Sequence, residues 1–216
     1  IGAKSEAEAL ELVQIGDPMV YTDTLESLHG NLISGRAFDD KAGTYSVMEA
    51  FKRLVSERNM LDCGLVSVAS VQEEVGTRGA ITASYTVAPR VGIAVDVGHA
   101  TDFPSCDAKR FGKFSLGAGP IIARGSNINP IIFDRLIACA EEHKIPYQIE
   151  TETYPTGTDA RAIQMTQRGI ATGLVSIPLR YMHTPVETAH LEDMENVVKL
   201  LVVFAESLHS DDTFEF

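Results

Sequence analysis

Acidic residues and one histidine stand at positions where this chain could carry out hydrolytic chemistry. Each lies at the end of an apolar run or just before a predicted helix. In open α/β sheets, ligands bind beyond the carboxyl ends of the strands, so we expect these side chains to share one pocket. The set consists of Asp39 and Asp40, Glu73 and Glu74, Asp96, and His183.

Five carboxylates in one pocket would repel each other by several kcal/mol, even at an effective dielectric constant near 20. Divalent cations reverse this balance because they become the largest local charges. Aspartate, glutamate and histidine ligands together suit zinc, cobalt or manganese. Two ions sharing a carboxylate can activate a water for hydrolysis. In the Glu73-Glu74 pair, one glutamate would then bind metal and its neighbour would transfer the proton.

Each member of the set also has a purely structural interpretation. An Asp-Asp pair ahead of a helix commonly caps it, a Glu-Glu pair commonly lies in a solvated loop, and a lone histidine is commonly structural. Asp96 is harder to explain in this way, because acids are rarely buried unless they are paired. The combination, rather than any one residue, favours a metal site.

The elements that must position these residues alternate between strand and helix. Such alternation predicts an open α/β sheet with helices on both faces. Apolar periodicity predicts helices at Lys41–Glu57, Asn129–Lys144, Asp159–Arg168 (closed by Gly169) and Leu191–Leu208, and strands at Leu65–Val71, Val91–Val97, Tyr147–Thr153 and Gly173–Ile177.

The first thirty residues differ from this pattern. They contain a polar, hairpin-like stretch with turn residues around His29-Gly30-Asn31. We therefore divide the chain into 1–30, the end of a small β-rich unit, and 31–216, an α/β domain.

Composition excludes several classes of function. The 216 residues carry a formal net charge of −12, which argues against a nucleic-acid binder and against docking on an anionic membrane. No apolar run approaches the length of a membrane-spanning helix, and no signal peptide is recognisable. The three cysteines form no CxxC pair, which fits reduced thiols and a cytoplasmic location. The chain begins with Ile1 rather than methionine, so upstream residues are an expectation.

Five sequence blocks resemble the motifs of the M42 family of metallo-aminopeptidases, some members of which carry a glucanase label. They occur in the order typical of that family, and the resemblance extends from the first residue to about His209. The blocks are GRAFDDKAG (35–43), SVQEEVGTRGA (70–80), GIAVDVGHA (92–100), YPTGTDARAIQ (154–164) and SIPLRYMHTPVE (176–187).

This resemblance implies a role for each candidate metal ligand. Asp39 would bridge two metal ions, and Asp40 would be its catalytic neighbour, joined to it by a cis peptide bond. Glu74 and His183 would bind one ion, and Asp96 would bind the other.

The resemblance also implies a mechanism. Glu73 would be the general base that takes a proton from a water shared by the two ions and passes it to the leaving amine. Glu187 would bind no metal itself but would hold His183 in position. The expected enzyme is an aminopeptidase with two divalent ions, zinc or cobalt in first place and manganese as a further option. Its substrate would be a peptide, and its assembly a homo-oligomer between a dimer and a dodecamer.

The resemblance further implies a zinc-exopeptidase-like α/β fold, with residues 1–30 as the end of an inserted β-barrel-like domain. One family feature is missing, because no HxD motif, the source of the family's first histidine ligand, occurs in these 216 residues. The chain could be part of a longer protein, could pair with a polypeptide that carries the rest, or could be a shortened and inactive relative. Two alternative functions therefore stay open, an inactive or incomplete metal-binding subunit and a glycoside hydrolase.

Overall fold

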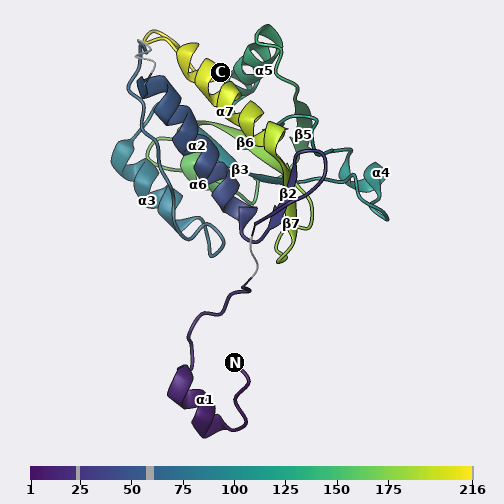
Figure 1. Ribbon diagram of the computed structural model, residues 1–216. Coiled ribbons are helices and arrows are strands. Elements are labelled where there is room, and N and C mark those ends of the chain that lie inside the picture. The colour runs from purple at the N-terminus through teal and green to yellow at the C-terminus, as the bar shows by residue number, and fades with distance from the viewer. Residues whose placement is uncertain (23–24, 57–60, 216) are drawn as a thin grey trace.

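A four-stranded mixed sheet lies at the centre of the molecule (Figure 1). The computed structural model describes residues 1–22, 25–56 and 61–215. In spatial order the strands are β3 (Val91–His99), β6 (Ala171–Leu179), β4 (Ile121–Gly125) and β5 (Gln148–Glu152). The β3–β6 and β4–β5 pairs are parallel, whereas β4 and β6 run antiparallel. The predicted open mixed sheet is confirmed.

Helices cover both faces of this sheet. They are α2 (Phe38–Ser56), α5 (Pro130–Glu142) and α7 (Leu191–Glu206), together with α3 (Arg78–Val87) and α6 (Asp159–Gln164). Two neighbouring residues of β3 show which helices cover each face, since successive side chains of a strand point in opposite directions. Gly92 faces α6, because a Cβ at this position would touch Ile163. Ile93 faces the opposite side, where it packs beside Gly173 under α5.

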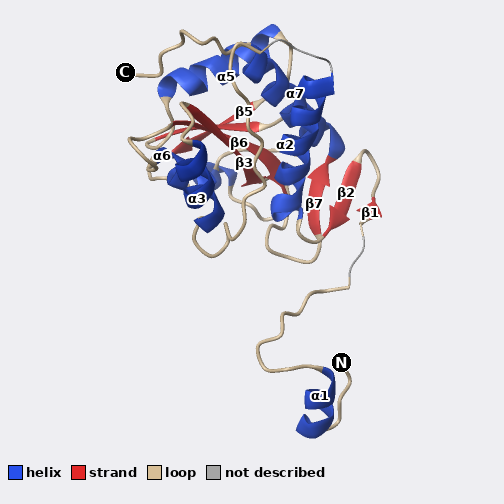
Figure 2. Ribbon diagram, turned by 90° about the vertical axis from the view of Figure 1, so that its left-hand side faces the viewer, coloured by secondary structure: helices blue, strands red, loops and turns tan. Residues whose placement is uncertain are grey.

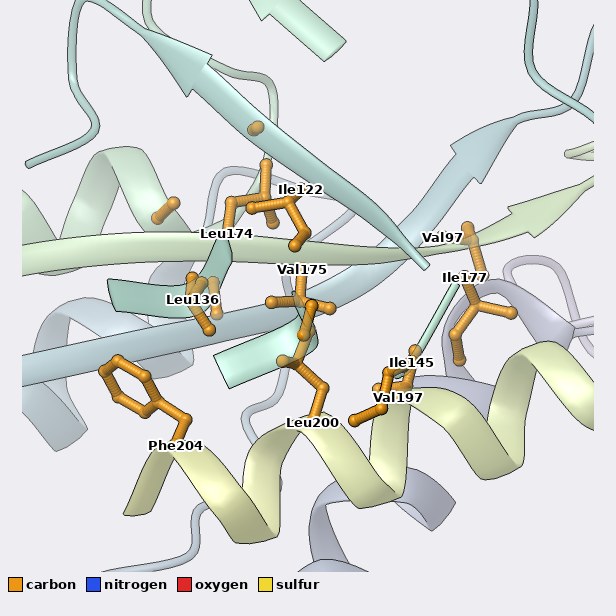
Figure 3. Packing of buried hydrophobic residues seen from close by; sticks show 14 of the residues in the cluster. Val97, Ile122, Leu136, Ile145, Leu174, Val175, Ile177, Val197, Leu200 and Phe204 are labelled. Carbon is orange, nitrogen blue, oxygen red and sulfur yellow. The ribbon is translucent and has the colours of Figure 1, made fainter. Parts of the chain in front are cut away.

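The core lies between the sheet and α7 (Figure 3). Val175 and Ile177 of β6 are fully buried, as are Val197 and Leu200 of α7. Strand β6 reads as a nearly continuous apolar run because it is covered on both faces, which is typical of a central strand. This packed centre fixes the carboxyl-terminal halves of β3, which contains Asp96, and of β6, after which His183 follows.

A second, smaller antiparallel sheet joins β1 (Glu26–Ser27), β2 (Leu32–Gly35) and β7 (Glu187–His190), as Figure 2 shows. The predicted hairpin around His29-Gly30-Asn31 corresponds to β1 and β2. The register pairs Gly35 with Glu187. This pairing brings the start of β7 next to the start of α2 and therefore sets the position of the site.

Most of the predicted elements are present. Helix α5 begins after the N-cap Asn129, with Pro130 as its first residue, and β3, β5, β6 and α7 fall within three residues of their predicted bounds. Residue Glu57, the predicted end of the first helix, lies outside the described residues. The prediction for α6 was too long: this helix ends at Gln164, and Gly169 (φ +93°) belongs to a separate turn.

The strand predicted at Leu65–Val71 is wrong. Residues 64–72 form neither helix nor strand, and they pair with no strand in the described part of the chain. Val66 is 58% exposed and Val71 is 65% exposed. An extended segment becomes a strand only when another strand satisfies its backbone groups, and local sequence does not report whether that neighbour exists.

The remaining helices lie away from the core. Helix α1 (Glu6–Leu12) has no buried residue, and Figures 1 and 2 both show it projecting from the body on an extended segment. The short α4 (Ala108–Phe111) follows β3. None of the helices in the described ranges is long and apolar enough to cross a membrane.

A buried carboxylate fastens α7 to the loop that precedes β4. Asp193 is fully buried and accepts hydrogen bonds from the backbone N–H groups of Gly117 (2.7 Å) and Gly119 (2.8 Å). We expect Asp193→Ala to lower the free energy of unfolding by about 2–4 kcal/mol, because two backbone donors lose their acceptor. Urea denaturation measures this, with Asp134→Ala on the exposed side of α5 as the control. Equal effects of the two variants would contradict the assignment.

Candidate metal centre

The Asp39-Asp40 pair lies in an unusual stretch of backbone at the start of α2. Both residues have non-helical dihedral angles, and the peptide bond between them is cis, as the family resemblance implied. The Asp40 carboxylate accepts a hydrogen bond from Gly43 N (2.8 Å). A Cβ at Gly43 would lie 2.3 Å from Asp40 Oδ2, so the close approach requires glycine at this position.

Glu187, the first residue of β7, ties together the two segments that carry candidate ligands. It is 2% exposed. Its Oε2 accepts hydrogen bonds from Phe38 N (2.7 Å) and Asp39 N (3.3 Å), and its Oε1 accepts one from His183 N (2.9 Å). Glu187 therefore supports the backbone of His183 rather than its imidazole ring.

His183 itself has a left-handed backbone (φ +64°), which is costly for a residue other than glycine. The hydrogen bond from its N–H to Glu187 helps to hold this conformation. The strand β6 ends at Leu179, and the turn after it directs the histidine toward α2. Sequence reasoning placed His183 correctly after a strand but gave no sign of the backbone geometry.

Three candidate ligands converge. Asp39, Glu74 and His183 each offer one ligand atom, and these three atoms all lie within 4.8 Å of one another. His183 Nε2 is 2.8 Å from Asp39 Oδ2 and 3.6 Å from Glu74 Oε2. Asp39 is 10% exposed, whereas His183 is 64% exposed, so the group is open to solvent on one side. Two oxygens and one imidazole nitrogen with an open position fit a divalent ion such as zinc.

The other candidate residues lie around this group. Asp96 is not among the three converging ligands, and its Oδ1 accepts a hydrogen bond from Val97 N (2.8 Å). It nevertheless lies within electrostatic reach of Asp39 and Glu73. Glu73 is partly buried beside Glu74. The structure thus brings all six residues to one region and makes a tight group of three of them.

Burial and like charges raise the pKa values of these acids. The pKa of Asp40 rises to about 8, first because the carboxyl is buried and next because Asp96 is near. The pKa of Asp96 rises to about 7 through burial and the charges of Asp39 and Glu73. Burial and then Glu74 raise the pKa of Asp39 to about 6. Carboxylates that resist ionisation in this way are stabilised as anions by a cation among them.

An open pocket of about 230 Å³ adjoins the three ligands. Arg36 lines it, and the Nε of this arginine is buried without a hydrogen-bond partner among the described residues. Sequence reasoning did not single out Arg36 as a pocket residue. Its position in GRAFDD, three residues before Asp39, was the available signal.

Asp159 is a second residue that sequence reasoning missed. Its Oδ2 accepts a hydrogen bond from Ser70 Oγ (2.5 Å), which links the start of α6 to the segment that carries Glu73. Its charge raises the pKa of Glu73, after the larger effect of burial. Asp159 lies in the YPTGTDARAIQ block, but its contact with Ser70 arises only from the tertiary fold.

Comparison with known proteins gives a consistent result. The sequence model of the family described as M42 glutamyl aminopeptidase matches residues 1–200. A lysyl aminopeptidase of Pyrococcus furiosus is 37% identical over 213 residues, which are 98% of this chain and 60% of that protein.

Two solved structures are similar to the whole fold. A TET aminopeptidase from a marine sediment Thaumarchaeota archaeon superposes with a TM-score of 0.92 at 32% identity, covering 98% of this chain and 60% of that one. The TET1 peptidase of Pyrococcus horikoshii, described as assembling into a tetrahedron or a large octahedral shell, gives 0.81 at 33% identity, covering 96% and 60%. The chain therefore spans about three fifths of the length of these relatives.

The three hydrogen bonds that Glu187 accepts predict that removing its charge lowers both stability and zinc affinity. We expect Glu187→Gln to lower the free energy of unfolding by about 1–3 kcal/mol, because the amide NH₂ faces a backbone donor. Zinc affinity should fall about 10–100-fold, since both ligand-bearing segments shift. Urea denaturation and competition with a chromophoric chelator measure the two effects. The exposed Glu142→Gln on α5 is the control, and a Glu187 variant that behaves like it would refute the role.

The raised pKa of Asp40 predicts how the metal-free protein responds to pH. The folded state holds the proton up to about pH 8, whereas the unfolded chain releases it near pH 4. The stabilising contribution is therefore complete below pH 4 and is lost as the pH rises toward 8.

We expect Asp40 alone to lower the free energy of unfolding of the metal-free protein by about 3 kcal/mol between pH 5 and pH 8, in addition to smaller falls from Asp39 and Asp96. Asp40→Asn should show a smaller fall, because the side-chain oxygen still accepts from Gly43 but no longer titrates. Urea denaturation in the presence of a chelator at both pH values tests this. Identical pH slopes for the two proteins would show that Asp40 does not carry the effect.

Proposed function

Because the chain belongs to the M42 glutamyl aminopeptidase family, we propose that it acts in a metal-dependent aminopeptidase that removes N-terminal residues from peptides. The observation that carries this proposal is the convergence of Asp39, Glu74 and His183. The chain spans only part of its relatives' length, so the activity belongs to the complete enzyme.

The donor set of the site fits divalent ions. We assign one ion to Asp39, Glu74 and His183, and a second to Asp39 and Asp96 with further ligands from outside these residues. Zinc and cobalt suit mixed oxygen and nitrogen donors, and manganese is also compatible. When bound, such ions polarise the scissile carbonyl and make the attacking water more acidic.

The residues of this chain then divide the work of hydrolysis. Glu73 accepts a proton from the attacking water and delivers it to the amine that leaves. Burial is the main cause of the raised pKa of Glu73. A pKa closer to neutral pH suits this carboxyl both to accepting a proton and to donating it. Asp40 holds its position through Gly43 N and keeps the adjoining Asp39 in place.

The same proposal extends to the assembly and the location of the complete enzyme. One related structure is described as a dodecamer and another as assembling into a tetrahedron or a large octahedral shell, which supports a homo-oligomer for the complete enzyme. We expect an assembly between a dimer and a dodecamer. The described cysteines are free thiols, which agrees with the cytoplasm as the proposed location.

The proposal predicts which variants lose metal and which lose turnover. Purified chain should bind at least one zinc or cobalt ion, and His183→Ala should weaken that binding more than tenfold, because one of three ligands is removed. His143→Ala, on an exposed histidine at the end of α5, should bind normally. Calorimetric titration and elemental analysis measure these outcomes. Equal binding by both variants would remove His183 from the site.

Glu73→Gln should keep its metal yet lose hydrolysis of an aminoacyl substrate by a factor of about 10²–10⁴. An N-acetylated substrate should resist cleavage, and a glucan should be untouched. Wild-type chain that binds metal but cleaves nothing would favour the second candidate function, a metal-binding subunit or portion that needs further polypeptide. The incomplete coverage of its relatives is the observation that favours this second candidate.

A further inference from the structure

The loop that carries His183 is closed at its base by backbone hydrogen bonds. Arg180 N donates to Thr188 O (2.9 Å), and Thr188 N donates to Arg180 O (3.0 Å). The residues between them connect β6 to β7, and inside this loop His183 N donates to Glu187. Because Glu187 also accepts hydrogen bonds from the start of α2, it attaches the loop to that helix.

A bidentate ion pair attaches the same loop to a second part of the molecule. Arg180 Nε donates to Asp102 Oδ1 (2.7 Å), and Arg180 Nη2 donates to Asp102 Oδ2 (2.8 Å). Leu116 N also donates to Asp102 Oδ2 (3.0 Å). Leu116 precedes Gly117, which the buried Asp193 holds, so the carboxylate of the ion pair is itself anchored. Bidentate arginine–carboxylate pairs fix geometry as well as adding energy.

This ion pair extends the link between β3 and β6 beyond the end of their ladder. The last residues that the two parallel strands pair are His99 and Leu179. Arg180 follows directly on β6, and Asp102 lies three residues after the end of β3. The two side chains therefore hold the chain segments together where the strands of the sheet no longer do so.

The backbone of the loop needs such support. Tyr181 (φ +59°) and His183 (φ +64°) both have left-handed backbones. Residues other than glycine rarely adopt this conformation, and it persists only where the surrounding structure determines it. The rings of Tyr181 and Phe103 lie with their centroids 5.6 Å apart, so the residues next to the ion pair are in contact as well.

We propose that Asp102 and Arg180 are positioning residues for the candidate metal centre. Their ion pair holds the turn that carries His183, and it thereby keeps the imidazole beside the two carboxylate ligands. Asp102 is not one of the three converging ligands, so the pair acts through the conformation of the loop. This inference rests on the proposed function, because it concerns the affinity of that site for its ion.

The proposal predicts weaker metal binding when the ion pair is broken. A loop that samples other conformations presents His183 correctly in only a fraction of the molecules, and the apparent dissociation constant rises by the inverse of that fraction. We expect Asp102→Ala and Arg180→Ala each to weaken zinc binding about tenfold, as is typical for residues that orient a metal ligand. Competition with a chromophoric chelator on the full chain measures this.

The sign of the arginine effect separates positioning from simple electrostatics. Loss of a positive charge near the site would strengthen cation binding if charge alone mattered, whereas loss of a positioning residue weakens it. The double variant should bind zinc about as well as the weaker single variant, because the same interaction is lost only once. Arg180→Lys keeps the charge but not the fork-shaped contact, so its affinity should lie between those of the wild type and Arg180→Ala.

A second bidentate ion pair provides a matched control. Arg135 of α5 donates to both oxygens of Asp212, and the side chains of this pair are 23% and 15% exposed, close to the 24% and 22% of Arg180 and Asp102. Figure 1 shows the C-terminus beside α5 and away from β7. Asp212→Ala should lower the urea midpoint but leave zinc affinity within about twofold of wild type, because the loop of His183 is untouched.

Several outcomes would overturn the proposal. Normal zinc affinity in both alanine variants would remove the pair from the positioning of His183, and tighter binding by Arg180→Ala would show that only charge matters. An equal loss of affinity in Asp212→Ala would show that binding follows overall stability. If an alanine variant does not fold, Arg180→Lys with wild-type affinity would refute the role. A wild-type chain that binds no zinc would refute the proposed function together with this inference, which distinguishes the two failures.

Discussion

The carboxylate of Glu187 makes the hydrogen bonds on which the geometry of the candidate metal centre depends. One buried side chain accepts hydrogen bonds from the start of α2 and from the turn after β6, two segments almost 150 residues apart in sequence. The antiparallel pairing of β2 with β7 delivers Glu187 to this point, because Gly35 is its register partner. The small sheet therefore aligns Asp39 with His183.

The sequence predicted which residues lie together better than it predicted the contacts that hold them there. Acids at the ends of apolar runs and a histidine after a strand were enough to gather the six residues, because strand ends converge in α/β sheets. The hydrogen bonds of Glu187 were not predictable in detail, since they are made to backbone groups whose positions depend on a left-handed residue. The contact between Ser70 and Asp159 likewise joins segments that only tertiary packing brings together.

The sequence predicted an element correctly where the segments that pack against it lie in the same chain. Strand β6 and helix α7 cover each other, so their apolar periodicity corresponds to real burial (Figure 3). Residues 65–71 have the same composition as a central strand, but the described residues provide no neighbour for them. A hydrophobic pattern records what a segment is suited to pack against, and it is silent about whether that surface is present.

The acidic side chains of the site bind protons as well as offering ligand atoms for a metal ion. With pKa values of about 6 to 8, Asp39, Asp40 and Asp96 are partly protonated near neutral pH. A cation bound at the proposed site would displace some of these protons and so release them to the surrounding solution. Protons and metal ions would then compete for the same oxygens, and the fraction of protein loaded with metal would depend on the pH of its surroundings as well as on the supply of ions.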